Sequence, residues 1–204
     1  MSSKTWDARL AYWLIRPFKD SWVTPNYFTT LRLVVGLGAG AAFASGHWPN
    51  LGALLLVLSN FLDHTDGELA RLSGKTSRAG HLYDLACDAI VHILLFVSIG
   101  IGLRETGLGA WALPLGVIAG LGVTMIFHLR HEMEQRHGKA AIRQPHLLGF
   151  EAEDVLYLLP LITLSGKLLP FLIAAAIGAP IVAVLVLIQF IHRQNTPKNL
   201  GQKP

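Results

Sequence analysis

Four aspartates stand at regular spacing in two neighbouring, largely apolar stretches of this 204-residue chain. Asp63 and Asp66 open the run D-H-T-D-G-E-L-A-R, and Asp84 and Asp88 close the run G-H-L-Y-D-L-A-C-D, which begins eight residues later. Ionisable side chains inside membrane-length apolar segments are costly, so each one is a candidate functional residue. Carboxylate oxygens are the ligands that Mg²⁺ and Mn²⁺ prefer, and these four aspartates are therefore candidate metal ligands.

Helix geometry places the two runs on facing sides of two helices. At about 100° per residue, the two acids of the first run share an arc of roughly 140° with Gly67, Ala70 and Arg71. In the second run, the acids follow Gly80 along one stripe of the next helix. A short connection over 72–79 predicts that the helices are antiparallel neighbours whose acidic faces meet. The small residues leave room for a ligand near the backbone, and the arginine offers a fork suited to phosphate, so the pattern indicates a divalent-metal diphosphate site.

The composition predicts a membrane protein of one small domain. The chain is 52% hydrophobic and 15% charged, and its mean hydropathy is +0.46. The net charge of +4 is explained by basic residues at one membrane face, so we expect no nucleic-acid partner. The single cysteine, Cys87, permits no internal disulfide and is expected to be a small packing residue.

The apolar pattern predicts an all-α integral membrane protein with six transmembrane helices. The predicted spans cover about 25–45, 51–72, 80–103, 108–129, 151–164 and 168–191, which together form a membrane domain over 23–192. Before it, residues 1–22 carry tryptophans and basic residues at helical spacing, as expected of an amphipathic helix lying in the membrane interface. Residues 193–204 are expected to form a tail.

The basic residues predict the orientation of these spans. Outside the spans, the side opposite the termini carries only Arg104 and Lys167, whereas the other basic residues lie on the side of the termini. Because cytoplasmic loops are enriched in lysine and arginine, we expect the termini and the acidic runs to be cytoplasmic, in a bacterial inner membrane.

The two acidic runs resemble, at every fixed position, the signature of the class I CDP-alcohol phosphotransferases, D-x-x-D-G-x-x-A-R, eight residues, G-x-x-x-D-x-x-x-D. The segment from Pro25 to Arg32 is similar to the P-N-x-x-T-x-x-R start of the first membrane helix in that family. The resemblance implies transfer of a substituted phosphate from a CDP-alcohol, such as CDP-diacylglycerol, to the hydroxyl of an acceptor alcohol. CMP is released, and the pathway is phospholipid biosynthesis.

The resemblance also implies roles for individual residues. The four aspartates would hold two Mg²⁺ or Mn²⁺ ions, and Asp88 would in addition take the proton of the attacking hydroxyl. The implied CDP-alcohol-binding residues are Asn26, Tyr27, Phe28, Thr29, Gly67, Ala70, Arg71, Ser77 and Gly80. An alternative for Asn26 and Thr29 is that they only cap a helix.

A second polar concentration lies between residues 128 and 154, on the same side as the acidic runs. In the family this region helps to form the acceptor pocket, so the candidate acceptor-binding residues are Arg130, His131, Arg143, Glu151 and Asp154. An ordinary solvated loop explains the same charges equally well.

Donor, acceptor and oligomeric state stay open at this point. Leu85 and Ala89 stand where phosphatidylglycerophosphate and cardiolipin synthases commonly carry proline and lysine, which weakens that assignment. The alternatives are a choline- or ethanolamine-type phosphotransferase with a lipid acceptor, a membrane prenyltransferase and a transporter. Glycines at helix-packing spacing, as at 36, 38 and 40, together with the family, favour a homodimer surrounded by membrane lipids.

Overall fold

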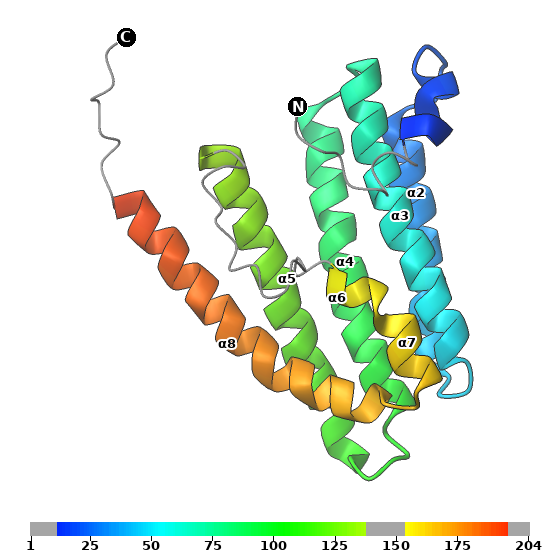
Figure 1. The fold of residues 1–204 in the computed structure, drawn as a ribbon, viewed down its shortest axis with the longest axis vertical. Helices are drawn as coiled ribbons and strands as arrows, with labels where there is room; N and C mark the ends of the chain where they lie inside the picture. The colour runs from blue at the N-terminus through cyan, green and yellow to red at the C-terminus, as the bar shows by residue number, and fades with distance from the viewer. Residues whose placement is uncertain (1–11, 138–153, 196–204) are drawn as a thin grey trace.

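The computed structural model describes residues 12–137 and 154–195, and every regular element in these two ranges is a helix. In chain order the helices are η1 (Arg16–Phe18), α2 (Pro25–Ala44), α3 (Pro49–Ser73), α4 (Arg78–Gly102), η2 (Gly109–Trp111), α5 (Ala112–His137), α6 (Asp154–Tyr157), α7 (Leu159–Leu164) and α8 (Leu168–Asn195) (Figure 1). The all-α expectation is therefore confirmed.

Helix boundaries follow from local sequence chemistry. Prolines at the first positions of α2 and α3 start these helices, since a first-turn residue has no intrahelical use for its N–H. Gly74 ends α3 in the left-handed conformation, with φ of 67°, and its N–H donates to the carbonyl of Ala70. Ser77 caps α4 by accepting a hydrogen bond from the N–H of Gly80. The connection between the two acidic helices is thus shorter than predicted and covers only 74–77.

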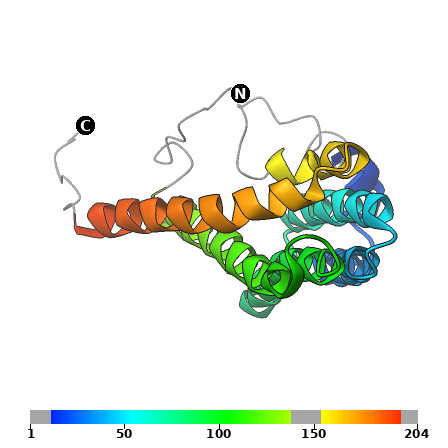
Figure 2. The same cartoon turned by 90° about the horizontal axis from the view of Figure 1, so that it is seen from below.

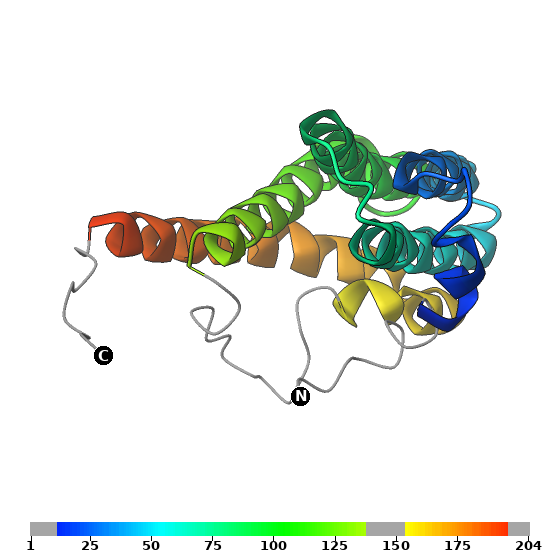
Figure 3. The same cartoon turned by 90° about the horizontal axis from the view of Figure 1, so that it is seen from above.

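The helix α2 is the centre of the first three long helices. It packs against α3 and against α4, whereas α3 and α4, both fully described, make no direct helix–helix contact with each other. Seen from above, α2 lies beside both of them, and α5 and α8 lead away to one side (Figure 3). The two acidic helices are antiparallel (Figure 1) and their acidic faces meet, as predicted, but α2 rather than direct packing of one on the other provides the packing surface for each. We call the end of this bundle that carries the start of α2, the end of α3 and the start of α4 the motif end.

The remaining described helices pack onto this group, with α6 and α7 against α3. The helix α5 contacts α4, and α8 contacts α5. Viewed from below, α8 runs across the bundle and extends beyond it (Figure 2). Phe43, Leu56, Leu95, Phe96 and Ile99 are buried in the main apolar cluster, which joins α2, α3 and α4 away from the motif end.

Close backbone approach between α4 and α5 depends on glycine. A Cβ on Gly116 would collide with the carbonyl of Phe96, and a Cβ on Gly120 would lie 3.1 Å from the Cα of Ile93. The glycine spacing on α5 thus allows close helix packing.

Four helical segments in the described chain are long and apolar enough to cross a membrane. They are Pro25–Ala44, Arg78–Gly102, Gly109–Arg136 and Leu168–Gln194. Helix α3 has 25 residues, but its acidic run keeps it out of this set on composition. The predicted span over 151–164 is not one continuous helix where it is described, because a turn at Leu158 separates α6 from α7, which begins at Leu159 with Pro160 in its first turn.

The predicted amphipathic helix over 1–22 is described only from Tyr12 onward. Residues 12–15 are helical and lead into η1, where Pro17 stands in the first turn. Trp13 is exposed, and Ile15 is fully buried. This two-sided pattern within a short segment is compatible with an interfacial position.

The glycine contact gives a stability prediction. Gly116→Ala should lower the free energy of unfolding by about 1–3 kcal/mol, because the backbone of α4 cannot give way to the new methyl group. Gly178→Ala on α8 is the matched control, since a Cβ there meets nothing within 4 Å and alanine favours a helix by about 0.5–1 kcal/mol. Thermal unfolding in detergent measures both. A Gly116→Ala protein as stable as the control would show that the helices do not approach this closely.

Candidate metal and diphosphate site

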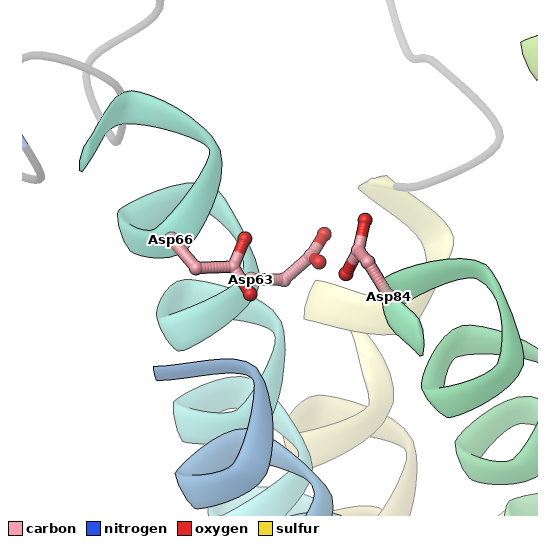
Figure 4. Close-up of side chains that lie close together, drawn as sticks. All are labelled: Asp63, Asp66 and Asp84. Carbon is pink, nitrogen blue, oxygen red and sulfur yellow. The ribbon is translucent and has the colours of Figure 1, made fainter. Parts of the chain in front are cut away.

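Three of the four predicted metal ligands converge at the motif end. Asp63 and Asp66 come from α3 and Asp84 from α4, and each offers a carboxylate oxygen within 4.8 Å of the others. Figure 4 shows the three side chains pointing toward one another across the space between the two helices. Asp66 is buried, and the other two are half-buried. An all-oxygen, partly buried set of acids that would otherwise repel one another fits a hard divalent cation.

The fourth aspartate joins this group through an arginine of α2. Arg32 is only 2% exposed, and its guanidinium forms ion pairs with Asp63, with Asp88 and, at 3.3 Å, with Asp84. Asp88 thus lies next to the three converging carboxylates without belonging to their group. A buried arginine in an apolar helix is tolerated because it is paired with acids on two other helices.

Thr29, one turn before Arg32 on α2, holds the remaining acid. Its hydroxyl donates a hydrogen bond of 2.7 Å to Oδ2 of Asp66, in the interior. The helix-capping alternative for this residue is wrong, since the N-cap position of α2 belongs to Thr24. Thr29 stays a predicted donor-binding residue, and its side-chain contact across the helices is with a candidate metal ligand.

Three predicted donor-binding residues meet at the start of α4. The side-chain oxygen of Asn26 lies 3.0 Å from the point where a Cβ of Gly80 would be, and the Ser77 hydroxyl lies 3.1 Å from it. The absence of a side chain on Gly80 therefore lets the side chain of Asn26 on α2 approach the start of α4 closely. Exposed N–H groups of a helix start next to an amide and a hydroxyl can bind an anionic group.

Arg71 lies along α3 over another glycine. Its two terminal guanidinium nitrogens are 3.7 Å from the point where a Cβ of Gly67 would be, and one of them donates to Glu68 at 2.8 Å. The arginine is exposed, whereas the glutamate is buried. Ala70 lies one turn beyond Asp66 on the same helix. The fork of Arg71 is thus held at the motif end, where it can reach a phosphate.

Two predicted donor-binding residues have their described contacts elsewhere. Tyr27 packs edge-on against Trp22, and Phe28 packs edge-on against Phe18. Both rings therefore contact the segment that precedes α2, and the structure gives them no contact with the acids.

One predicted acceptor-binding residue, His131, belongs to a pair of stacked histidines. The rings of His81 on α4 and His131 on α5 have centroids 5.3 Å apart. The side-chain nitrogen of Gln135 lies 3.2 Å and 2.8 Å from their respective Nε2 atoms. Of the other predicted acceptor residues, Arg130 is half-buried on α5, whereas Arg143, Glu151 and the side chain of Asp154 lie outside the described residues.

Three residues of this region were not among the predicted site residues. They are Arg32, His81 and Gln135. Arg32 carried a signal, because it is a charge inside an apolar helix, three residues after Thr29 and therefore on the same face. The two others had no comparable signal, since their proximity depends on how α4 packs against α5.

The described helices form a bundle with an acidic cluster between two of them, and four segments are long and apolar enough to cross a membrane. The chain belongs to the CDP-alcohol phosphatidyltransferase family, whose model matches residues 22–191. The resemblance found in the sequence is thereby confirmed. The family and the apolar helices together make this an integral membrane protein.

Individual relatives are distant. The chain is 25% identical over 168 residues to the "Bifunctional IPC transferase and DIPP synthase" of Aquifex aeolicus. The aligned region covers 80% of this chain and 38% of that protein. The chain is 35% identical over 103 residues to the CDP-diacylglycerol–glycerol-3-phosphate 3-phosphatidyltransferase of Cereibacter sphaeroides, covering 48% and 45%. The chain thus spans less than half the length of these curated relatives.

A solved structure shares the fold. Phosphatidylinositol phosphate synthase of Mycobacterium tuberculosis, with CDP-DAG bound, superposes with a TM-score of 0.58 at 20% identity and covers 98% of both chains. Another structure of that enzyme holds manganese and citrate. The family is metal-dependent, and the three close acids of this chain agree with that property.

The hydrogen bond of Thr29 leads to a prediction about the acid cluster. Thr29→Val keeps the shape of the side chain but removes the donor to buried Asp66, so the free energy of unfolding should fall by about 1–3 kcal/mol. Thr30→Val is the matched control, because that hydroxyl bonds to Tyr83 at an exposed position and its loss should cost less than about 1 kcal/mol. Chemical unfolding in detergent compares the two variants. Equal losses would contradict a special role for the buried bond.

Proposed function

We propose that this protein transfers a substituted phosphate group from a CDP-alcohol, with CDP-diacylglycerol as the donor, to the hydroxyl of an acceptor alcohol. The observation that carries the proposal is the convergence of Asp63, Asp66 and Asp84, next to Asp88, in a chain of this family. The product is a phosphodiester of phospholipid biosynthesis, and CMP is the leaving group.

Four aspartates are enough to hold two divalent ions, Mg²⁺ or Mn²⁺. Such ions, when bound, neutralise the charge of a diphosphate and of the departing phosphate. The chain itself binds the donor at the motif end. Arg71 contacts a phosphate oxygen, and the start of α4, with Ser77 and Asn26 beside Gly80, receives the nucleotide end.

Asp88 acts as the base of the reaction in this proposal. It accepts the proton of the acceptor hydroxyl, whose oxygen then forms a bond to the phosphorus that carries the donor's alcohol. The bond from this phosphorus to the CMP oxygen breaks, and CMP takes the electron pair. Arg32 supports this role by holding the Asp88 carboxylate next to the other acids.

In this proposal the acceptor binds between α4 and α5. His131 and Arg130 were expected there from the sequence, and His81 and Gln135 add polar groups at the same level. Arg143, Glu151 and Asp154 remain proposed acceptor contacts. Imidazoles, an amide and a guanidinium suit a phosphorylated or polyhydroxylated acceptor better than an apolar lipid alcohol.

Six membrane crossings are the proposed topology. The helices α5 and α8 both run from the lower to the upper end in Figure 1, so the chain must cross back between them. Helix α3 has the length of a crossing, and α6 with α7 belongs to the return. An interfacial helix over 1–22 precedes these crossings.

The orientation follows from the charges and is proposed as cytoplasmic for the motif end and both termini, in a bacterial inner membrane. The test is a C-terminal fusion to a reporter that works only outside the cytoplasm. Activity of this reporter would contradict the orientation. A homodimer is proposed from the glycine-spaced faces and the family, and the detergent-corrected mass from light scattering decides between monomer and dimer.

The reaction is tested by CMP release from purified protein. CDP-diacylglycerol and CDP-amino alcohols are offered as donors with a panel of inositol phosphate, glycerol phosphate and lipid alcohols. Activity should disappear with a chelator and return with Mg²⁺ or Mn²⁺, since the acids need a cation to receive a diphosphate. Full turnover in chelator, or ion uptake into vesicles without CMP release, would contradict the proposal.

Two acid variants separate the base from the metal ligands. Asp88→Asn should lower the rate by about 10²- to 10⁴-fold as a lost general base does, while donor affinity is largely kept, because the three converging acids are intact. Asp66→Asn should weaken donor binding as well as turnover, since it removes one of the three. Calorimetry gives donor affinity for both variants, and CMP release gives the rate. An Asp88→Asn protein with near-native turnover would rule out the base role, and loss of donor binding would make Asp88 chiefly a metal ligand.

A further inference from the structure

Arg32 engages the acid cluster in a regular way. One of its terminal nitrogens, Nη1, is paired with Oδ1 of Asp63 and Oδ1 of Asp84, and the other, Nη2, is paired with Oδ1 of Asp88. On the preceding turn of the same helix, Thr29 donates to Oδ2 of Asp66. A single face of α2 thus contacts one carboxylate oxygen of each of the four aspartates.

The position of Arg32 is fixed on its own helix. Its side chain is buried, and its carbonyl accepts a hydrogen bond of 3.0 Å from the hydroxyl of Ser59 on α3. One turn further along α2, Gly36 packs so closely that an added Cβ would lie 2.8 Å from Val91 of α4. The guanidinium is therefore held between α3 and α4 by contacts to both helices.

We infer that Arg32 is a positioning residue for the metal site: it holds one oxygen of Asp63, Asp84 and Asp88 and so presents the other oxygen of each to a divalent ion. The inference rests on the proposed function only in taking a divalent ion as the ligand. A planar fork is required, because one point charge cannot hold three carboxylates from two helices in fixed orientations. Groups that orient metal ligands in this way typically change metal affinity by about 10- to 100-fold when they are replaced.

A competing role for Arg32 makes the opposite prediction. A guanidinium that only stands in for the cation would compete with the ion for the same carboxylates, and its removal would strengthen metal binding. Its positive charge alone also repels a divalent ion. Orientation and competition therefore differ in the sign of the effect on metal affinity, which can be measured without any reaction.

The test is direct Mn²⁺ binding to the full-length protein in detergent, without donor, followed by the paramagnetic resonance signal of free Mn²⁺. Arg32→Gln and Arg32→Lys are compared with the native protein. Both variants should bind Mn²⁺ about 10- to 100-fold more weakly, because the lysine keeps the charge but loses the fork. Arg136→Lys is the matched control, since Arg136 pairs with Glu132 on an exposed face of α5. The Mn²⁺ affinity of this variant should equal that of the native protein.

Each outcome decides the role of Arg32. If Arg32→Gln does not fold, Arg32→Lys preserves the buried positive charge and carries the comparison. Tighter or unchanged Mn²⁺ binding in the folded variants would overturn the inference. A native protein that binds Mn²⁺ but releases no CMP would refute the proposed reaction and leave the role of Arg32 to the variant affinities. A native protein that does not bind Mn²⁺ would refute both.

Discussion

Four carboxylates gathered between membrane helices impose a strict electrostatic condition on this structure. Negative charges removed from water must be paired with positive charge or with hydrogen-bond donors, or the site will not form. The chain meets this condition with α2, which packs against both acidic helices and carries Thr29 and Arg32 on one face. The helix that has no acid of its own therefore determines how the acids are arranged.

The direction of the three helices explains why the contacts occur in layers. The helices α2 and α4 run from the motif end into the bundle, and α3 runs the opposite way (Figure 1). Arg32 is consequently level with Asp63 and Asp88, one turn deeper than Thr29 and Asp66. Below these layers the packing is apolar and close, with Phe43, Leu56, Leu95 and Phe96 buried. Polar chemistry is thus confined to one end of an otherwise apolar bundle.

Much of this site could be predicted from the sequence, because the relevant information is local to two helices. The spacing of Asp63, Asp66 and Asp84 predicted their convergence, since helical periodicity puts the acids of each run on one face and the short connection turns the two faces toward each other. The position of α2 between these helices could not be predicted in the same way, because it depends on side-chain volumes along three helices at once.

The histidine pair shows the same limit. His81 and His131 lie 50 residues apart in the numbering, and only the packing of α4 against α5 brings their rings together. The segment predicted as a span over 151–164 is interrupted for a different reason. Apolar composition identified the segment correctly as non-polar, but the turn at Leu158 ahead of Pro160 is a backbone effect that average hydropathy does not contain.

The turn between α3 and α4 limits which insertions and deletions this protein can accept during evolution. Gly74 and Ser77 fix both ends of a four-residue connection. The number of residues between the two acidic runs, which is eight, therefore sets how the acids of α3 and α4 are oriented toward each other. Adding or removing one residue within a helical part of this interval would rotate the following acids by about 100° and shift them by about 1.5 Å, away from their partners. Length variation in this interval would therefore separate Asp84 from Asp63 and Asp66. Side-chain replacement on α5, where the acceptor is proposed to bind, leaves the length of this interval unchanged.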